Sequence, residues 1–214
     1  MNIIIVLTPL IGTIFGVMYF YNSKEFVELL LAQPIKRSSI FLGQYLGVAI
    51  SLSASLVLGI GIPFLLYGIF LSQDIFNFLF LLLDGMLLTF IFVGISFYIS
   101  LCNNDKIKGF GYSIALWLFF AVIYDGLFLV SLIMFEDYPL DKFSLIATIL
   151  NPIDLSRILV LLKLDISALL GYTGALFQKF FGTNLGLVIS LTMLFTWVLG
   201  PLYFFIRHSK KKDF

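Results

Sequence analysis

The chain of 214 residues is 61% hydrophobic and only 12% charged, with a mean hydropathy of +1.09. This composition lies far outside the range of soluble globular domains, so the sequence predicts an all-α integral membrane protein. The formal net charge of +1 gives no basis for a nucleic-acid partner. The single cysteine, Cys102, and the single histidine, His208, exclude a disulfide framework and a His/Cys metal cage, so no metal site is expected.

Five long apolar runs predict membrane-spanning helices, because a backbone in lipid must satisfy its own hydrogen bonds. They cover residues 3–21, 40–71, 76–101, 110–134 and 183–206. The second run is longer than a straight crossing of the ~30 Å hydrocarbon core requires, so we expect either a kink at Pro63 or an extension into the cytoplasm. The first run has no basic residue ahead of it and no clear cleavage site, which favours a retained span over a signal peptide.

The basic residues indicate how the spans are oriented. Segments 22–39, 102–109 and 207–214 contain nine of the 13 Lys and Arg residues. These nine are Lys24, Lys36, Arg37, Lys106, Lys108, Arg207, Lys210, Lys211 and Lys212. Because cytoplasmic segments carry the excess of positive charge, the amino terminus is expected outside and the carboxyl terminus in the cytoplasm.

The short charged stretch SKEFVELLLAQ, residues 23–33, separates the first two spans and predicts a cytoplasmic helix. Asn22 is placed to cap this helix, and Pro34 ends it, because the residue before a proline is disfavoured in a helix. Its predicted apolar stripe consists of Phe26, Leu29, Leu30 and Gln33. A helix this short is marginal alone in water, so either the membrane surface or a partner protein must hold it.

The second span follows two basic residues and carries a repeat of small residues. Lys36 and Arg37 mark the cytoplasmic interface, and Ser38 or Ser39 is expected to cap the span. Small residues then recur at every fourth position, namely Gly43, Gly47, Ser51, Ser55 and Gly59. Such a repeat lets two helices approach closely, which predicts either a dimer interface or ordinary packing within one subunit. The GxxxG motif at 12–16 in the first span has the same two interpretations.

Asp84 and Asp125 are the acidic residues that lie well inside predicted spans, and both are expected at a similar depth in the outer half. A carboxylate in lipid is costly unless it is paired, protonated or hydrated, so these residues and Tyr124 are candidate functional residues. Three interpretations stay open: a structural pair that shares a proton, the wall of an outward cavity for substrate, or an aspartyl protease dyad. The segment 81–87, LLLDGML, lacks the Gly-x-Gly-Asp element that the protease would need.

The longest segment between spans is the predicted outer loop, residues 135–182, which is expected to be helical. Asn151 can cap a helix that begins at Pro152, with Asp154 in its first turn. Two further short helices are expected to start near Asp165 and Thr173. All three have an apolar face, so they should lie on the membrane surface or pack on the spans.

Two stretches resemble known transporters. LLLAQPIKRSSIFLGQYLG, residues 29–47, resembles ABC-2 type exporter permeases, in which a short cytoplasmic coupling helix precedes a Leu-x-x-Pro-(Val/Ile)-x-Arg pattern. The matching residues are Leu31, Pro34, Ile35, Arg37, Ile40, Leu42, Gly43, Leu46 and Gly47, whereas Gln44 stands where the family commonly has Lys. Residues 115–130 and 151–182 are similar to the permease subunit of the ABC complex that matures nitrous oxide reductase.

The resemblance implies that residues 1–214 form one transmembrane permease domain in the inner membrane of a bacterium. The family usually has six spans, so a five-span chain either is naturally short or lacks a first span. The implied partners are a second copy in a homodimer, a cytoplasmic ATPase subunit that binds ATP and Mg, and a periplasmic copper-handling protein. The coupling residues would be Phe26, Glu28, Leu29, Leu30, Lys36 and Arg37, and the dimer contact would involve Gly43, Gly47, Ser51 and Ser55.

The sequence has no phosphate-binding GxxxxGK[ST] loop, so this chain is expected to be a transporter subunit with no cofactor of its own rather than an enzyme. The scarcity of Cys and His and the scatter of the methionines favour a sulfur-containing species, a lipidic group or mechanical work as the cargo, rather than naked copper. The alternatives are a proton-coupled carrier that uses Asp84 and Asp125, or an ABC-2 exporter permease for another substrate.

Overall fold

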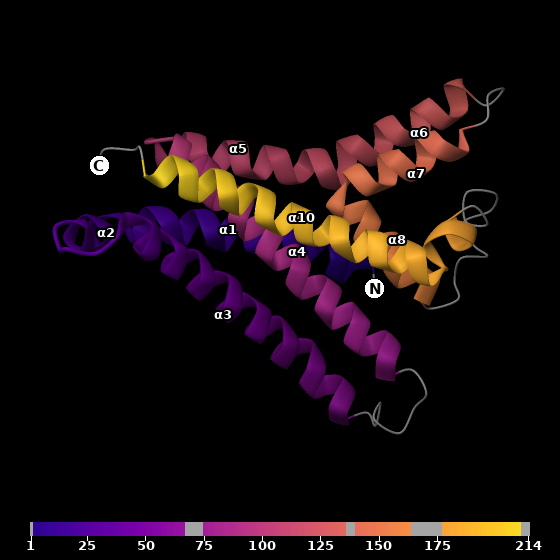
Figure 1. Ribbon diagram of the computed structural model, residues 1–214, viewed down its shortest axis with the longest axis horizontal. Helices are drawn as coiled ribbons and strands as arrows, with labels where there is room; N and C mark the ends of the chain where they lie inside the picture. Colours follow the sequence, from indigo (N-terminus) through magenta and orange to yellow (C-terminus); the bar gives the residue numbers. More distant parts are fainter. Residues whose placement is uncertain (1, 67–74, 136–139, 164–176, 211–214) are drawn as a thin grey trace.

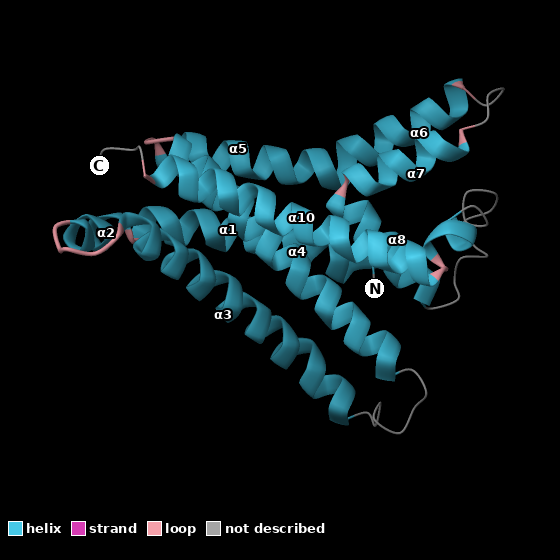
Figure 2. Ribbon diagram, viewed as in Figure 1, coloured by secondary structure: helices cyan, strands magenta, loops and turns pink. Residues whose placement is uncertain are grey.

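The computed structural model describes residues 2–66, 75–135, 140–163 and 177–210. All regular secondary structure within these ranges is helical (Figure 2). Five helical stretches are long and apolar enough to cross a membrane, and they coincide with the five predicted runs. The prediction of an all-α integral membrane protein is therefore confirmed.

The spans and connecting helices follow one another in the order that Figure 1 shows. The spans are α1 (Asn2–Asn22), α3 (Arg37–Leu66), α4 (Ile75–Cys102), the continuous run of α5 (Lys106–Leu118), the π-helix η2 (Phe119–Ile123) and α6 (Tyr124–Met134), and α10 (Asn184–Ser209). The helices between the spans are α2 (Lys24–Leu31), α7 (Asp141–Leu150) and α8 (Pro152–Lys163). Figure 1 places α2 and the C-terminus at one end of the molecule and α6 and α7 at the other.

The start of α3 differs from the prediction. The helix begins at Arg37, so Ser38 and Ser39 lie inside its first turn and the prediction that one of them caps it is wrong. The carbonyl of Lys36 accepts the first backbone bonds instead, from Ser39 and Ile40. Pro63 lies inside the helix, which continues to Leu66, the end of its described part.

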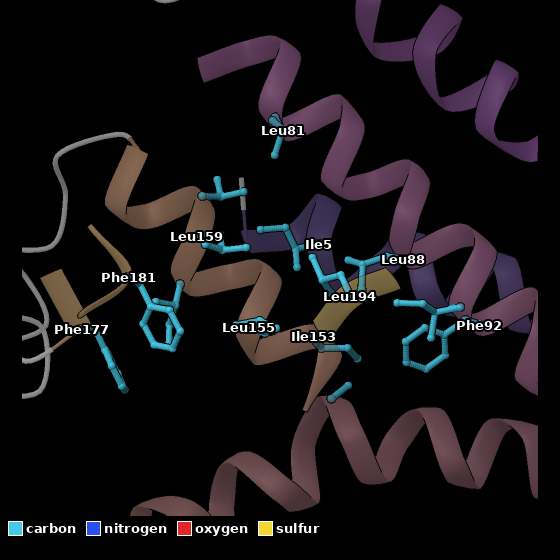
Figure 3. Close-up of a cluster of buried hydrophobic side chains, with 14 of the residues drawn as sticks. Ile5, Leu81, Leu88, Phe92, Ile153, Leu155, Leu159, Phe177, Phe181 and Leu194 are labelled. Atoms are coloured by element: carbon cyan, nitrogen blue, oxygen red, sulfur yellow. The ribbon is translucent and has the colours of Figure 1, made fainter. Parts of the chain in front are cut away.

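Two clusters of buried apolar side chains hold the bundle together. The cluster near α2 includes Val27 and the aromatic residues Phe41, Tyr45, Phe97 and Phe205. The aromatic rings meet largely edge to face. The larger cluster joins α1, α4, α8 and α10. Figure 3 shows side chains of α8 from this cluster pointing toward α1 and α4.

The segment predicted as an outer loop contains a sharply bent pair of helices. The axes of α7 and α8 differ by 111°, and α8 is buried against α1, α4 and α10. Of the two predicted placements for these helices, α8 therefore takes the one in which it packs on the spans. The helices expected to start near Asp165 and Thr173 lie outside the described residues, apart from a short helical segment at 177–181.

Candidate functional site

The helix α2 follows α1 almost without a break. Because α1 continues to Asn22, the prediction that Asn22 caps α2 is wrong. Ser23 takes the N-cap position, and its hydroxyl donates to the Phe20 carbonyl at 3.3 Å instead of capping α2. The side-chain oxygen of Asn22 accepts a 3.0 Å hydrogen bond from Lys106 Nζ, which ties the start of α5 to the end of α1.

The apolar side chains of α2 point in two directions. Val27 is only 3% exposed, and the partly buried Leu30 and Leu31 pack with it against the cluster at this end of the bundle. By contrast, Phe26 and Leu29 are 60% and 69% exposed. The prediction that Phe26, Leu29, Leu30 and Gln33 form one stripe is therefore wrong, because Leu30 packs against the bundle and the other three are exposed. Leu30 is thus an anchor of α2, whereas Phe26 and Leu29 lie on its free side.

The free side of α2 combines apolar and charged groups. We define the α2 surface by its exposed residues, Lys24, Glu25, Phe26, Glu28 and Leu29. Lys24 Nζ and Glu28 Oε1 lie 3.9 Å apart, a weak exposed ion pair. Gln44 Nε2 donates a 2.9 Å hydrogen bond to Ser23 Oγ and so connects α3 to the start of α2. Lys36 and Arg37, at the start of α3, are also exposed.

The small-residue repeat of α3 is exposed, and its C-terminal part borders a cavity that residues of α1 also line. We call Gly43, Gly47, Ser51, Ser55 and Gly59 the α3 ladder; all five are exposed. A Cβ atom added at any of the three glycines would meet no heavy atom within 4 Å. Ordinary packing within the described part of one subunit therefore does not account for Gly43, Gly47 and Ser51, whereas Ser55 and Gly59 line the cavity beside α1.

The GxxxG motif of the first span behaves differently from the α3 ladder. A Cβ atom on Gly12 would lie 3.5 Å from the Thr89 carbonyl oxygen, and one on Gly16 would clash with the hydroxyl of Ser96. Gly16 therefore lets α1 approach α4 closely, while a Cβ atom on Gly12 would make an ordinary van der Waals contact with α4. For this motif, packing within one subunit is the correct interpretation.

Asp84 lies at the centre of the bundle. Its side chain is fully buried, and its Oδ1 accepts a 3.0 Å hydrogen bond from Ser156 Oγ on α8. Among the described residues its Oδ2 has no hydrogen-bond partner. This carboxyl group therefore contacts α8 through a single hydroxyl.

Asp125 contacts a different residue of α8. Its Oδ2 lies 2.5 Å from Arg157 Nη1, and the same nitrogen lies 3.3 Å from Oδ1 of Asp154. The structure thus gives Asp84 and Asp125 separate partners, Ser156 and Arg157, which are consecutive residues of α8. Arg157 escaped the sequence analysis because it belongs to the predicted outer loop. Its one sequence signal is its position three residues after Asp154, on the same face of a largely apolar helix.

Asn151 joins three parts of the fold at the bend between α7 and α8. Its Oδ1 accepts a 3.0 Å bond from the Ile153 backbone, so it caps α8 as predicted. Its Nδ2 donates to the Phe120 carbonyl at 2.9 Å and to Asp154 Oδ2 at 2.7 Å. Phe120 belongs to η2, and π-helical segments are frequent at functional sites.

Tyr124, the third candidate polar residue inside the spans, also contacts the bent pair. Its hydroxyl donates a 2.7 Å hydrogen bond to the Ala147 carbonyl of α7. Both Tyr124 and Asp125 therefore attach α6 to the α7–α8 pair rather than to α4.

A cavity of about 350 Å³ opens beside this polar cluster, between α6, α7 and α8. The charged residues that line it are Asp125, Asp154 and Arg157. The apolar part of its wall is made by Phe128, Leu129, Leu132, Ile158, Leu161 and Phe177. Within the described ranges, no group of three or more His, Cys, Asp or Glu side chains is placed to hold a metal ion.

The fold and these surfaces define a multi-pass α-helical membrane protein with a short amphipathic helix at one end. No family model matches the chain. It is 26% identical over 136 residues to the probable ABC transporter permease protein NosY of Stutzerimonas stutzeri, a match that covers 61% of this chain and 49% of the relative. It is 26% identical over 149 residues to the protein of the same name from Pseudomonas aeruginosa, covering 65% of this chain and 53% of the relative.

The chain thus spans about half the length of the curated relatives it matches. Both relatives carry the name of an ABC transporter permease, the class that residues 29–47 resemble. The similarity supports a relationship to ABC transporter permeases and to NosY in particular.

Proposed function

We propose that the chain is the membrane-spanning permease subunit of an ATP-driven ABC transporter that serves the copper-site assembly of nitrous oxide reductase. The similarity to two probable ABC permeases supports the first part of this proposal. The resemblance of residues 115–130 and 151–182 supports the second part. The observation that carries the proposal is the α2 surface, where Phe26 and Leu29 are exposed on a helix that Val27 fixes to the bundle.

The α2 surface is suited to receive a soluble partner. Large exposed apolar side chains beside charged groups are typical of interaction sites. The partner proposed here is a cytoplasmic ATPase subunit, which would bind ATP and Mg. Because Val27 and Leu30 pack into the bundle and Gln44 bonds to Ser23, a force on Phe26 and Leu29 would pass to α1 and α3.

The distribution of positive charge supports a cytoplasmic location for α2. Lys24, Lys36 and Arg37 flank or lie on α2, and Lys106 bonds to the end of α1 beside it. We place this end in the cytoplasm, with the amino terminus outside, in the inner membrane of a bacterium. A periplasmic copper-handling protein would then meet the opposite end, near α6 and α7.

A second copy of the chain is the partner that we propose for the α3 ladder. Small residues let two transmembrane helices approach closely, and the exposed Gly43, Gly47 and Ser51 offer such a contact over about two helical turns. ABC permeases would work as a pair around such an interface, so each copy would receive its own ATPase subunit.

The alternatives make different use of the same residues. A proton-coupled carrier would use Asp84 and Asp125, whereas the separate bonds of these residues to Ser156 and Arg157 argue against a structural pair that shares a proton. An ABC-2 exporter permease for another substrate would have the same α2 surface. It would differ in the periplasmic proteins that accompany it.

The proposal is tested by isolating the tagged chain from its native membranes in a mild detergent and identifying every protein that accompanies it. We expect an ATPase with a phosphate-binding loop in comparable amount, and its loss in the variants Glu28→Lys and Leu29→Asp. Ile107→Asp is the matched control, because Ile107 is 83% exposed in the first turn of α5. Recovery of the unaltered chain without an ATPase would contradict the proposal.

A further inference from the structure

The cavity between α6, α7 and α8 combines a charged end with an apolar wall. At the charged end, one guanidinium group, Arg157, stands against two carboxylates, Asp125 and Asp154. Among the residues that line the cavity, the two acidic side chains outnumber the single basic one. The other end is lined by Phe128, Leu132 and other apolar side chains.

The two carboxylates differ in how well they are satisfied. Asp154 is only 7% exposed, and its Oδ2 accepts the bond from Asn151. Among the described residues its Oδ1 accepts no hydrogen bond, and it lies 3.3 Å from Arg157 Nη1, near the carboxyl group of Asp125. The side chain of Asp125 is 34% exposed, so a molecule that enters the cavity can reach it. A buried acceptor and an accessible one therefore border the same space.

We propose that this cavity is a binding site for a cationic amphiphile, a primary amine attached to a hydrocarbon chain. An ammonium group offers three donors and no acceptor, so it can serve Asp125 and Asp154 at once and balance the negative charge. The hydrocarbon chain would lie against Phe128, Leu132 and Ile158, where burial of apolar surface stabilises it.

Other head groups fit the site less well. A head group that ends in a carboxylate or a phosphate, with no ammonium group at its end, would approach two carboxylates and face their repulsion. An alcohol donates one hydrogen bond and brings no positive charge to the two acidic side chains. The amine can come from a phospholipid with an amine head group or from a free long-chain amine. This assignment concerns the chain by itself and does not depend on a partner ATPase.

The test uses a long-chain primary amine that carries a photoreactive diazirine in its chain, together with the matched carboxylic acid and alcohol. The full chain is placed in nanodiscs of phosphatidylcholine, labelled by light and mapped by mass spectrometry. We expect the amine to label the peptides of α6 and α8 and excess dodecylamine to compete with it. Competition by phosphatidylethanolamine would identify a lipid source, and its absence would identify a free amine; both results support the site.

Four variants separate the site from a purely structural ion cluster. Asp125→Asn should lower labelling by about tenfold or more, since it removes one charged partner in a partly desolvated site, while the distant Glu25→Gln should not. Leu132→Trp fills the apolar part without a change of charge and should also block labelling. Ile133→Trp is its control, because Ile133 is 74% exposed and does not line the cavity.

The inference is overturned if the amine and the acid label the chain equally, or if the labelled peptides lie outside α6 and α8. It is also overturned if Leu132→Trp labels as strongly as Ile133→Trp. The Leu132 variant keeps the test decisive even where loss of the ion pair at Asp125 impairs folding.

Discussion

At the scale of single residues, Asn151 connects the bend between α7 and α8 to the π-helix of the neighbouring span. Its role as a cap could be predicted, because Asn followed by Pro at the start of an apolar run is a local pattern. Its bonds to Phe120 and Asp154 could not be predicted in this way. They depend on how a distant span packs against α8, which local periodicity does not reveal.

Replacement of Asn151 should therefore cost more than the loss of an ordinary cap. We expect Asn151→Ala to lower the free energy of unfolding by about 2–4 kcal/mol, because a cap is lost and buried groups lose their partner. Thr183→Ala, which removes the exposed cap of α10, should cost about 1 kcal/mol. Unfolding by SDS in mixed micelles measures both values, and equal losses would contradict the connecting role of Asn151.

The candidate acids show where reasoning from sequence ends. Asp84 and Asp125 could be identified as unusual because each carboxylate lies in an apolar run. Their separate partners, Ser156 and Arg157, lie in a segment that sequence analysis assigned to an outer loop. The burial of α8 results from packing against α1, α4 and α10, so no local pattern could reveal it.

The two acids yield a prediction that separates a permease from a proton-coupled carrier. Asp84→Asn should leave nucleotide-dependent activity nearly unchanged, because the amide oxygen still accepts the bond from Ser156 and no charge remains buried. Activity of the purified complex in liposomes, with and without ATP, measures this. Loss of a proton-driven, ATP-independent flux in the variant would favour the carrier.

At the scale of elements, the two GxxxG motifs have the same spacing but different surroundings. A Cβ atom added at Gly12 or Gly16 of α1 would contact α4, while one added at a glycine of the α3 ladder would meet no heavy atom of the described chain within 4 Å. Sequence analysis left both interpretations open for both motifs. The difference arises from the direction in which each helix presents its small residues, which only tertiary packing decides.

Matched substitutions should separate the two roles. Gly16→Val should lower the free energy of unfolding of the subunit by about 1–3 kcal/mol, because the added atoms press on Ser96 and Val93 of α4. Gly47→Val makes the same chemical change in open space, so it should leave subunit stability within about 0.5 kcal/mol. It should instead weaken the proposed dimer, as single-molecule subunit counting in liposomes would show. Unchanged dimerisation would contradict a role for the α3 ladder.

At the scale of the whole molecule, the five spans could be predicted to within a few residues, because apolar length and backbone satisfaction in lipid determine them. The start of α8 at Pro152 could also be predicted, but α7 and the 111° bend between the two helices could not, because they depend on packing against the spans. The orientation proposed from the positive charges does not depend on the bent pair α7–α8. It concerns which side of the membrane receives α2.

The single cysteine offers a direct test of orientation. Cys102 is exposed at the end of α4, close to the start of α5, and we place this connection in the cytoplasm. A membrane-impermeant maleimide should therefore label the unaltered chain in inside-out vesicles and not in right-side-out vesicles. Labelling from the outer side alone would reverse the proposed topology and remove α2 from reach of an ATPase.

The measurement that tests the central claim most directly is photo-crosslinking from the α2 surface in native membranes. A benzophenone amino acid would replace Leu29 and, as a control, Ile107, which is similarly exposed in α5. We predict that position 29 forms a strong crosslink to an ATPase subunit and that position 107 forms little or none. A chain that crosslinks from position 29 only to lipid, or equally from both positions, would contradict the assignment of α2 as the ATPase contact.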